Sequence, residues 1–182
     1  MDPFKMRQAT FGRKNHSPAG ALAPMPVLAL WQPDRPHNLG AALRLCACLD
    51  VELDVIEPTG FPLDAKRIRE AALDYGALAR WHRHALPEDF LALRRGQGRR
   101  LVLLSTGADT PYHQARFRAG DVLLLGSESR GVPEHVHELV DLRLRIPMAP
   151  GRRSLNVVAA AALVLGEALR QTGALDRLGA AT

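Results

Sequence analysis

A chain of 182 residues is long enough for one domain with an extension and too short for two full-sized domains. Its composition, 47% hydrophobic and 24% charged, excludes a wholly disordered chain. Because no apolar run approaches the ~20 residues that a membrane-spanning helix needs, we expect a globular protein outside the membrane.

The net charge of +5, from 24 Lys and Arg against 19 Asp and Glu, makes a polyanion such as nucleic acid the first partner to test. Residues 1–26 hold four basic residues and one acid, which leaves 20 basic and 18 acidic residues from 27 to 182. The positive excess is therefore largely a property of the N-terminal segment. Arginine supplies 21 of the basic residues, which fits bidentate phosphate binding and fits a coding bias equally well.

The chain divides into a flexible basic extension over 1–26, a folded domain over 27–175 and a C-terminal tail over 176–182. Within the domain, short apolar runs alternate with helical patterns. Strands are predicted at 27–31, 51–57, 79–82, 100–105, 122–125 and 142–146, and helices at 38–49, 64–75, 87–94 and 154–171. This alternation is typical of an α/β fold, and we predict a mostly parallel sheet of five or six strands with helices on both faces.

In an open parallel sheet, ligands bind beyond the carboxyl ends of the strands. Of the loops at that edge, the first with unusual residues leads into Asn38-Leu39-Gly40-Ala41-Ala42-Leu43-Arg44. Gly40 allows a close approach, and Arg44 projects from the same helical face as Gly40. The alternative is that Asn38 caps the helix and Arg44 is solvated.

The second loop is Gly126-Ser127-Glu128-Ser129-Arg130-Gly131-Val132-Pro133, directly after a buried strand. Two glycines around small hydroxyl residues indicate a loop that exposes its backbone amides to a ligand, and the alternative is an ordinary turn. The glycine spacing excludes a dinucleotide-binding fingerprint and a P-loop.

The third loop ends the strand at Ile146, continues through two prolines and Gly151, and opens the last helix with Ser154. The Ser154 hydroxyl is expected either to cap that helix or to face a substrate. Asn156 then lies in the first turn of an apolar helix, where a polar side chain needs a partner.

Other polar residues carry weaker signals. His82, His84, His135 and His137 are predicted to lie on a solvated surface and to bind no metal. Arg94, Arg95, Arg99 and Arg100 are predicted to form a solvated turn, with phosphate contact as the alternative. Cys46 and Cys48, two apart on a helix, cannot pair, which fits a reducing, cytoplasmic compartment.

Together and in this order, the N-x-G-x-x-x-R, G-S-E-S-R-G-V-P and I-P-M-x-P…S-L-N segments resemble the three motifs of the SpoU branch of the SPOUT RNA methyltransferases. Further likeness, in Trp31-Gln32-Pro33, Ile56-Glu57-Pro58, Gly60-Phe61 and Leu73-Asp74-Tyr75, is to the tRNA (cytidine/uridine-34) 2′-O-methyltransferases. The resemblance covers about 27 to 173.

The resemblance implies a SPOUT fold with a C-terminal trefoil knot, a homodimer, S-adenosylmethionine as cofactor and tRNA as substrate. It places cofactor contacts on Leu104, Gly126, Ile146 and Ser154. Its catalytic and substrate-orienting positions fall on Asn38, Arg44, Glu128, Ser154 and Asn156. No metal is implied, because the cofactor's own positive charge makes its methyl group a good electrophile.

The reaction implied is methylation of the ribose 2′-hydroxyl of the wobble nucleoside 34. A guanidinium is effectively always protonated, so Arg44 is expected to stabilise the developing alkoxide rather than to remove the proton. Two alternatives stay open: 2′-O-methylation at another tRNA or rRNA position, and a non-enzymatic RNA-binding module.

Overall fold

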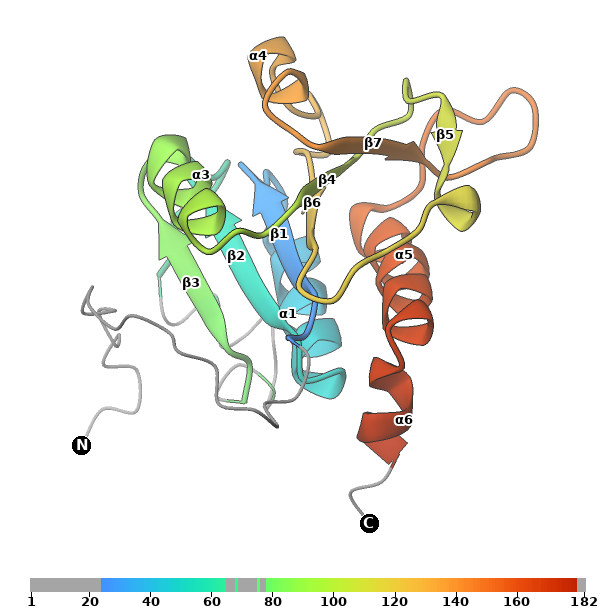
Figure 1. Ribbon diagram of the computed structural model, residues 1–182. Coiled ribbons are helices and arrows are strands. Elements are labelled where there is room, and N and C mark those ends of the chain that lie inside the picture. Colours follow the sequence, from blue (N-terminus) through green and yellow to red (C-terminus); the bar gives the residue numbers. More distant parts are fainter. Residues whose placement is uncertain (1–23, 65–67, 69–74, 76–77, 180–182) are drawn as a thin grey trace.

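The computed structural model describes residues 24–64, 68, 75 and 78–179 (Figure 1). Most of the expected N-terminal extension and most of the helix predicted over 64–75 lie outside the described residues. The division of the chain into extension, domain and tail stays a prediction.

A seven-stranded parallel sheet forms the centre of the described chain, in the order β3-β2-β1-β6-β4-β7-β5 (Figure 1). Its strands are β1 (Val27–Trp31), β2 (Glu52–Ile56), β3 (Trp81–His84), β4 (Leu101–Leu104), β5 (Thr110–Pro111), β6 (Val122–Leu125) and β7 (Leu142–Arg145). The predicted parallel sheet is confirmed. The strand missed by sequence analysis is β5, whose two residues form no apolar run.

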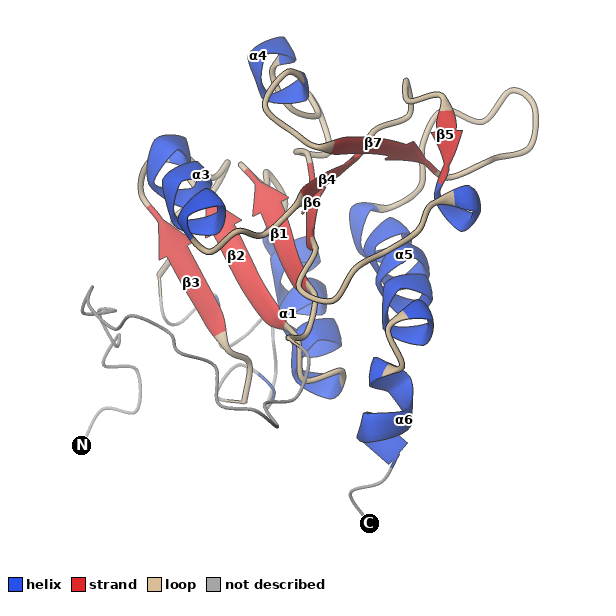
Figure 2. Cartoon of the chain, viewed as in Figure 1, coloured by secondary structure: helices blue, strands red, loops and turns tan. Residues whose placement is uncertain are grey.

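Helices cover both faces of the sheet, as predicted (Figure 2). They are α1 (Pro36–Cys48), α3 (Pro87–Gly96), α4 (Glu134–His137), α5 (Val157–Gln171) and α6 (Ala174–Gly179), with a short 3-10 helix at Tyr112–Gln114. Helices α1 and α5 share one apolar core, and α3 and α4 share the other. None of the helices that the structure describes is long and apolar enough to cross a membrane.

Strand β1 shows why its sequence reads as an unbroken apolar run. All five residues are buried, but they alternate between the two cores. Leu28 and Leu30 pack with α1 and α5, whereas Val27, Ala29 and Trp31 pack on the side of α3. A strand covered on both faces has no polar side, so periodicity alone does not reveal its two environments.

Some predicted boundaries were wrong. Strand β3 begins at Trp81, two residues later than expected, because its pairing with β2 sets its register. Helix α5 begins at Val157 rather than at Ser154. Helix α6 occupies Ala174–Gly179, where no helix was predicted, and its Ala174 side chain is buried in the core.

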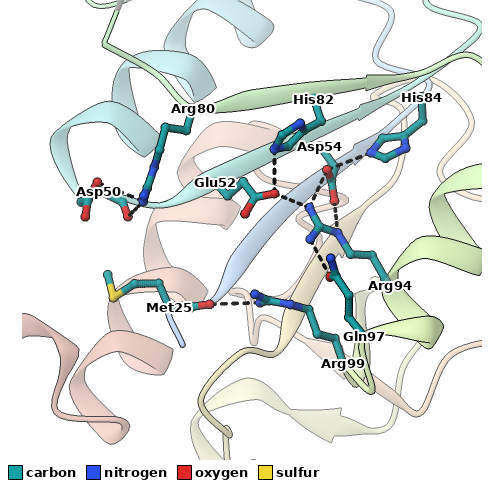
Figure 3. Close-up of polar contacts among 10 residues, drawn as sticks. All are labelled: Met25, Asp50, Glu52, Asp54, Arg80, His82, His84, Arg94, Gln97 and Arg99. Atoms are coloured by element: carbon teal, nitrogen blue, oxygen red, sulfur yellow. Dashed lines mark hydrogen bonds and ion pairs between the residues drawn. The ribbon is translucent and has the colours of Figure 1, made fainter. Parts of the chain in front are cut away.

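A polar cluster with a buried centre, formed by Asp54, His84 and Arg94, joins β2, β3 and α3 (Figure 3). We call it the Arg94 cluster: Glu52, Asp54, His82, His84 and Arg94. The Arg94 guanidinium donates to both Asp54 carboxylate oxygens, at 2.7 and 2.8 Å, and to Glu52 at 2.7 Å. His84 Nε2 lies 2.9 Å from Asp54 Oδ1, and His82 Nε2 lies 2.9 Å from Glu52 Oε1.

The predictions of solvated surface for His84 and of a solvated turn for Arg94 were therefore wrong. Arg94 is 1% exposed and His84 7% exposed. Sequence analysis missed this because their partner Asp54, fully buried, lies in the middle of a strand that reads as half-exposed. The bond from His82, helped by Arg94, lowers the pKa of Glu52 to about 2, and the same bond raises the pKa of His82.

The three neighbouring arginines of that turn are also held by the fold. Arg95 donates to the carbonyl of Leu139, and Arg99 donates to the carbonyls of Met25 and Gly120. Arg100 forms a two-pronged pair with Asp121, at 2.6 and 3.0 Å. Phosphate contact through this turn is therefore not supported.

Candidate active site

Three segments far apart in the chain meet beyond the carboxyl ends of the strands. Asn156 Nδ2 donates to Asn38 Oδ1 at 3.0 Å across 118 residues of sequence. Asn38 Nδ2 in turn donates to Glu128 Oε1. We call these three residues the asparagine relay. The structure thus brings together one predicted residue from each of the three loops.

The direction of the relay is fixed at one end by helix α5. Asn156 is the N-cap of α5, and its Oδ1 accepts the backbone N–H groups of Val158 at 2.9 Å and Ala159 at 3.3 Å. Because its oxygen is used in this way, its amide nitrogen must face Asn38. Two sequence-based interpretations were therefore wrong: Ser154 does not cap the helix, and Asn156 precedes the first turn rather than lying in it.

Asn38 is buried inside α1 rather than at its end. The helix begins at Pro36, and the capping position is held by Arg35 without a side-chain bond. Asn38 is 2% exposed, so its amide needs partners at both ends, and Glu128 and Asn156 supply them. The interpretation of Asn38 as a helix cap was wrong because the proline already starts the helix.

A second contact, missed by sequence analysis, holds the loop of Glu128 against the start of α1. The Asp34 backbone N–H donates to Glu128 Oε2 at 3.1 Å. The Asp34 carboxylate accepts from the Ser129 backbone N–H at 3.1 Å and from its hydroxyl. We call this contact the Asp34–Ser129 junction. A signal was available, since an acid two residues before Pro36 and a serine beside Glu128 are both typical of loop hydrogen bonding.

Close packing explains two glycines at this edge. A Cβ on Gly126 would lie 2.3 Å from the carbonyl carbon of Gly131, which is backbone and cannot give way. A Cβ on Gly60 would lie 2.8 Å from Cα of Asp34. Both positions need glycine because the chain passes directly over them.

The loop from Gly126 to Pro133 is less open than predicted. Ser127 and Gly131 bond each other in both directions, at 3.0 and 2.9 Å, and the Arg130 N–H donates to the Ser127 hydroxyl. With Ser129 bonded to Asp34, these four amides have partners inside the chain. The expectation that the loop offers these amides to a ligand was wrong, because the turn is closed on itself.

A pocket lies beside the relay at the ends of β4 and β7. Its walls are Leu104, Ser105, Thr106, Leu144, Ile146, Met148, Leu155 and Ala160. Of the predicted cofactor contacts, Leu104 and Ile146 line this pocket. Gly126 and Ser154 do not, although Leu155, next to Ser154, does.

Arg44 is exposed on α1 and bonds to none of the three relay residues, whereas Asn38 of the same helix is buried. Its guanidinium carbon is 5.0 Å from the centre of the Tyr75 ring, within the range of a cation–π contact. Within one chain the structure therefore does not join Arg44 to Asn38, Glu128 or Asn156. Among the described residues, no three His, Cys, Asp or Glu side chains gather as a metal site would require.

Comparison with known proteins shows the family to which this chain belongs. The model of the SpoU rRNA Methylase family matches residues 25–166. The chain belongs to the SpoU methylase family. That match includes all three loops and every residue of the relay.

Two relatives that share one enzyme name are similar to this chain over most of their length. The chain is 54% identical over 152 residues to a tRNA (cytidine(34)-2'-O)-methyltransferase of Beijerinckia indica, which covers 84% of this chain and 95% of the relative. It is 49% identical over 153 residues to the protein of the same name from Ancylobacter novellus, over 84% of this chain and 97% of the relative.

Solved structures of related methyltransferases have the same fold as this chain. A structure concerned with 2-OH methylation of C/U34 on tRNA has a TM-score of 0.75 and 37% identity, over 83% of this chain and 98% of that one. The SpoU methyltransferase AviRb from Streptomyces viridochromogenes, solved with AdoMet, has a TM-score of 0.68 and 29% identity, over 82% of this chain and 58% of that one.

Proposed function

We propose that this SpoU-family chain transfers a methyl group from S-adenosylmethionine to the ribose 2′-hydroxyl of nucleotide 34 of tRNA. The relatives whose names state this activity align with this chain over almost their whole length. The observation that carries the proposal is the asparagine relay, which joins the three family motifs through hydrogen bonds at the carboxyl edge of the sheet.

The pocket beside the relay suits the cofactor. Its walls are mostly apolar and include Met148 and Leu155, which suits an adenine ring, while Ser105 and Thr106 offer hydroxyl groups to polar edges. S-adenosylmethionine, when bound, supplies a methyl group on a positively charged sulfur. We assign Leu104 and Ile146 to its apolar contacts and place Gly126 and Ser154 at the rim.

The relay is suited to orient the substrate. Asn38 uses one amide hydrogen and its amide oxygen inside the relay. Asn156 donates one amide hydrogen to the relay, and its oxygen accepts from the backbone of α5, so both side chains are held in one orientation. Glu128 anchors the far end. We assign Ser154, exposed two residues before the cap, and Asn156 to the ribose hydroxyls, so that positioning supplies much of the catalysis.

Arg44 is assigned to the alkoxide that develops on the ribose oxygen. Its permanent charge stabilises that oxygen, and the proton leaves to an RNA phosphate or to water. Since Arg44 does not reach the relay of its own chain, we propose that it serves the site of a second copy. This requires a homodimer.

The exposed face of α1 and α5 suits such a dimer. The two helices pack against each other, and α1 exposes Ala41, three residues before Arg44. Helix α5 exposes Ala159, Ala162 and Leu163, the last by 46%. An apolar face of this kind marks an interaction surface. Leu163→Glu is expected to yield a folded monomer with little activity, measured by sedimentation and by methyl transfer.

Two further features follow from the family resemblance and belong to the proposal. Residues 146–156 lead from β7, which lies between β4 and β5, to α5, and we propose that this segment takes part in a C-terminal trefoil knot. We place the protein in the cytoplasm, where tRNA is modified. No metal is required.

Methyl transfer to defined tRNA tests the function. The purified chain is incubated with tritium-labelled S-adenosylmethionine and a tRNA that carries cytidine 34, alongside the same tRNA with 2′-deoxycytidine at that position. We expect label on the first and none on the second. Equal labelling of both indicates another tRNA position, labelling of rRNA alone indicates an rRNA enzyme, and cofactor-independent RNA binding without labelling indicates a binding module.

A further inference from the structure

The Asp34–Ser129 junction fixes two arginines at the edge of the site. Arg35 follows Asp34 directly, and Arg130 follows Ser129 directly. Because the junction consists of two hydrogen bonds to one carboxylate oxygen, the backbone positions of Arg35 and Arg130 are held relative to each other. Loops that are 95 residues apart in sequence thus each carry an arginine directly beside this junction.

These two arginines belong to the part of the arginine set that the fold leaves unpaired in the described chain. Their side chains are exposed, and within the described residues neither guanidinium makes a hydrogen bond or an ion pair. Eight other guanidiniums are held by carboxylates or carbonyls of the fold: Arg80, Arg83, Arg94, Arg95, Arg99, Arg100, Arg145 and Arg170. Arg116, Arg118, Arg143, Arg152 and Arg153 resemble Arg35 and Arg130 in this respect, but Arg35 and Arg130 are the pair that adjoins the Asp34–Ser129 junction.

The neighbouring acids do not neutralise Arg35 and Arg130 by contact. Asp34 Oδ2 accepts both bonds from Ser129, and the Glu128 carboxylate accepts from Asn38 and from the Asp34 backbone. The other Asp34 oxygen, Oδ1, is buried without a hydrogen-bond partner among the described residues, and Arg35 attracts the Asp34 carboxylate without bonding to it. The two guanidiniums therefore keep their donors for an anion from outside.

We propose that Arg35 and Arg130 form a phosphate clamp that holds the RNA backbone beside the nucleotide to be methylated. A guanidinium presents a planar fork of donors that matches phosphate oxygens. The clamp is one hydrogen bond away from the relay, since the Asp34 N–H reaches Glu128. A phosphate gripped there places the adjoining ribose near the relay. This inference rests on the proposed function and adds the residues that position its substrate.

Arginine variants test the clamp. In Arg35→Ala and Arg130→Ala, the KM for tRNA is expected to rise roughly tenfold each, the usual effect of removing one charged hydrogen bond, with kcat and cofactor affinity unchanged. The slope of log affinity for tRNA against log salt is expected to fall by about 0.7 for each single-strand phosphate that the variant no longer neutralises. Arg116→Ala, an exposed arginine in the loop before β6, is the matched control and is expected to change neither.

Ser129→Ala separates positioning from charge. It keeps both arginines but removes the hydroxyl bond to Asp34. We expect a raised KM with the salt slope retained, and a KM in the Ser129→Ala/Arg130→Ala pair no higher than in Arg130→Ala alone. Arg35→Lys, which keeps the charge but not the fork, is expected to retain the slope and restore part of the affinity.

Two results overturn the clamp. One is an unchanged KM and salt slope in the double variant Arg35→Ala/Arg130→Ala. The other is a loss of cofactor affinity in place of RNA affinity, which would assign the arginines to the cofactor's carboxylate. The binding measurement does not depend on turnover, so an inactive wild-type chain contradicts the proposed function while the clamp is still judged by its salt slope.

Discussion

The Arg94 cluster and the asparagine relay both join distant segments around one parallel sheet, but they differ in how far their polar groups are buried and paired. In the Arg94 cluster, Asp54 is fully buried, and Arg94 bonds Asp54, Glu52 and Gln97. In the relay, Asn38 is buried, whereas Asn156 and the neighbouring Ser154 are exposed. The relay ends at exposed polar groups, whereas the exposed end of the Arg94 cluster, His82, is paired with Glu52.

This difference separates polar groups that stabilise the fold from polar groups that can bind a substrate. A buried charge is tolerated when each donor and acceptor has a partner, and such a network stabilises one packing of β2, β3 and α3. A site that binds a substrate must keep donors available. Variants of the Arg94 cluster are therefore expected to change stability, and variants of the site are expected to change activity.

The largest expected effect is on activity. Arg44→Ala is expected to lower methyl transfer to tRNA by at least about 100-fold, as is typical when a group that stabilises a developing oxyanion is removed. The affinity for S-adenosylmethionine, measured by calorimetry, is expected to stay within a few-fold. The free energy of unfolding is expected to fall by no more than about 1 kcal/mol, from loss of the exposed cation–π contact with Tyr75. Methyl transfer equal to that of the wild type would remove Arg44 from the mechanism.

The next effect is on stability. Arg94→Met is expected to lower the free energy of unfolding by about 3–5 kcal/mol, because it leaves the Asp54 carboxylate buried without its cation. Urea denaturation followed by circular dichroism measures the change. The kcat of the folded fraction is expected to match the wild type. Arg80→Met, which removes the exposed pair with Asp50, is the control and is expected to lose less than about 1 kcal/mol.

A subtler variant separates the two roles of one residue. Asn156→Asp keeps an oxygen for the α5 cap, so the thermal midpoint is expected to stay close to that of the wild type. It loses the amide donor to Asn38 Oδ1, and methyl transfer is expected to fall roughly tenfold, the typical effect of removing one hydrogen bond from a site. Asn156→Ala, which loses both, serves for comparison. Full activity in Asn156→Asp would show that the relay is only structural.

The smallest effect depends on pH. Glu52→Gln is expected to lower the free energy of unfolding by about 1.5 kcal/mol near neutral pH. Since the folded pKa of Glu52 is lowered to about 2, its contribution is present above its usual value near 4.5 and is lost as the pH falls toward 2. The pKa of folded His82 is raised above its usual 6.5, so the share from His82 is fully present below 6.5 and is lost as the pH rises through the higher pKa of the folded state. A difference between variant and wild type that is constant from pH 2 to 9 contradicts this account.

The sequence was sufficient for most of the strands and for the three loops because both are local patterns. Val27–Trp31 and Val122–Leu125 were correct to the residue, since buried parallel strands appear as unbroken apolar runs. The polar side chains were found where loops follow those runs. Asn156 was singled out because a polar residue at the start of an apolar helix needs a partner.

What the sequence could not supply was pairing across distance. The role of Asn38 as the middle of a relay depends on Glu128 and Asn156, which lie 90 and 118 residues away. Arg94 reads as solvated because charged residues usually are, and only the buried Asp54, 40 residues away, reverses that interpretation. In the Asp34–Ser129 junction each residue is typical of loop hydrogen bonding, but their pairing across 95 residues was missed for the same reason.

The most direct test of the proposed activity is made in cells. tRNA from cells that lack the gene is digested and analysed by mass spectrometry for 2′-O-methylated nucleosides, and the modification is mapped by position. We expect 2′-O-methylation at nucleotide 34 to be absent, to return with the wild-type gene, and to stay absent with the Arg44→Ala gene. Unchanged methylation at nucleotide 34 in the deleted strain would contradict the proposed function.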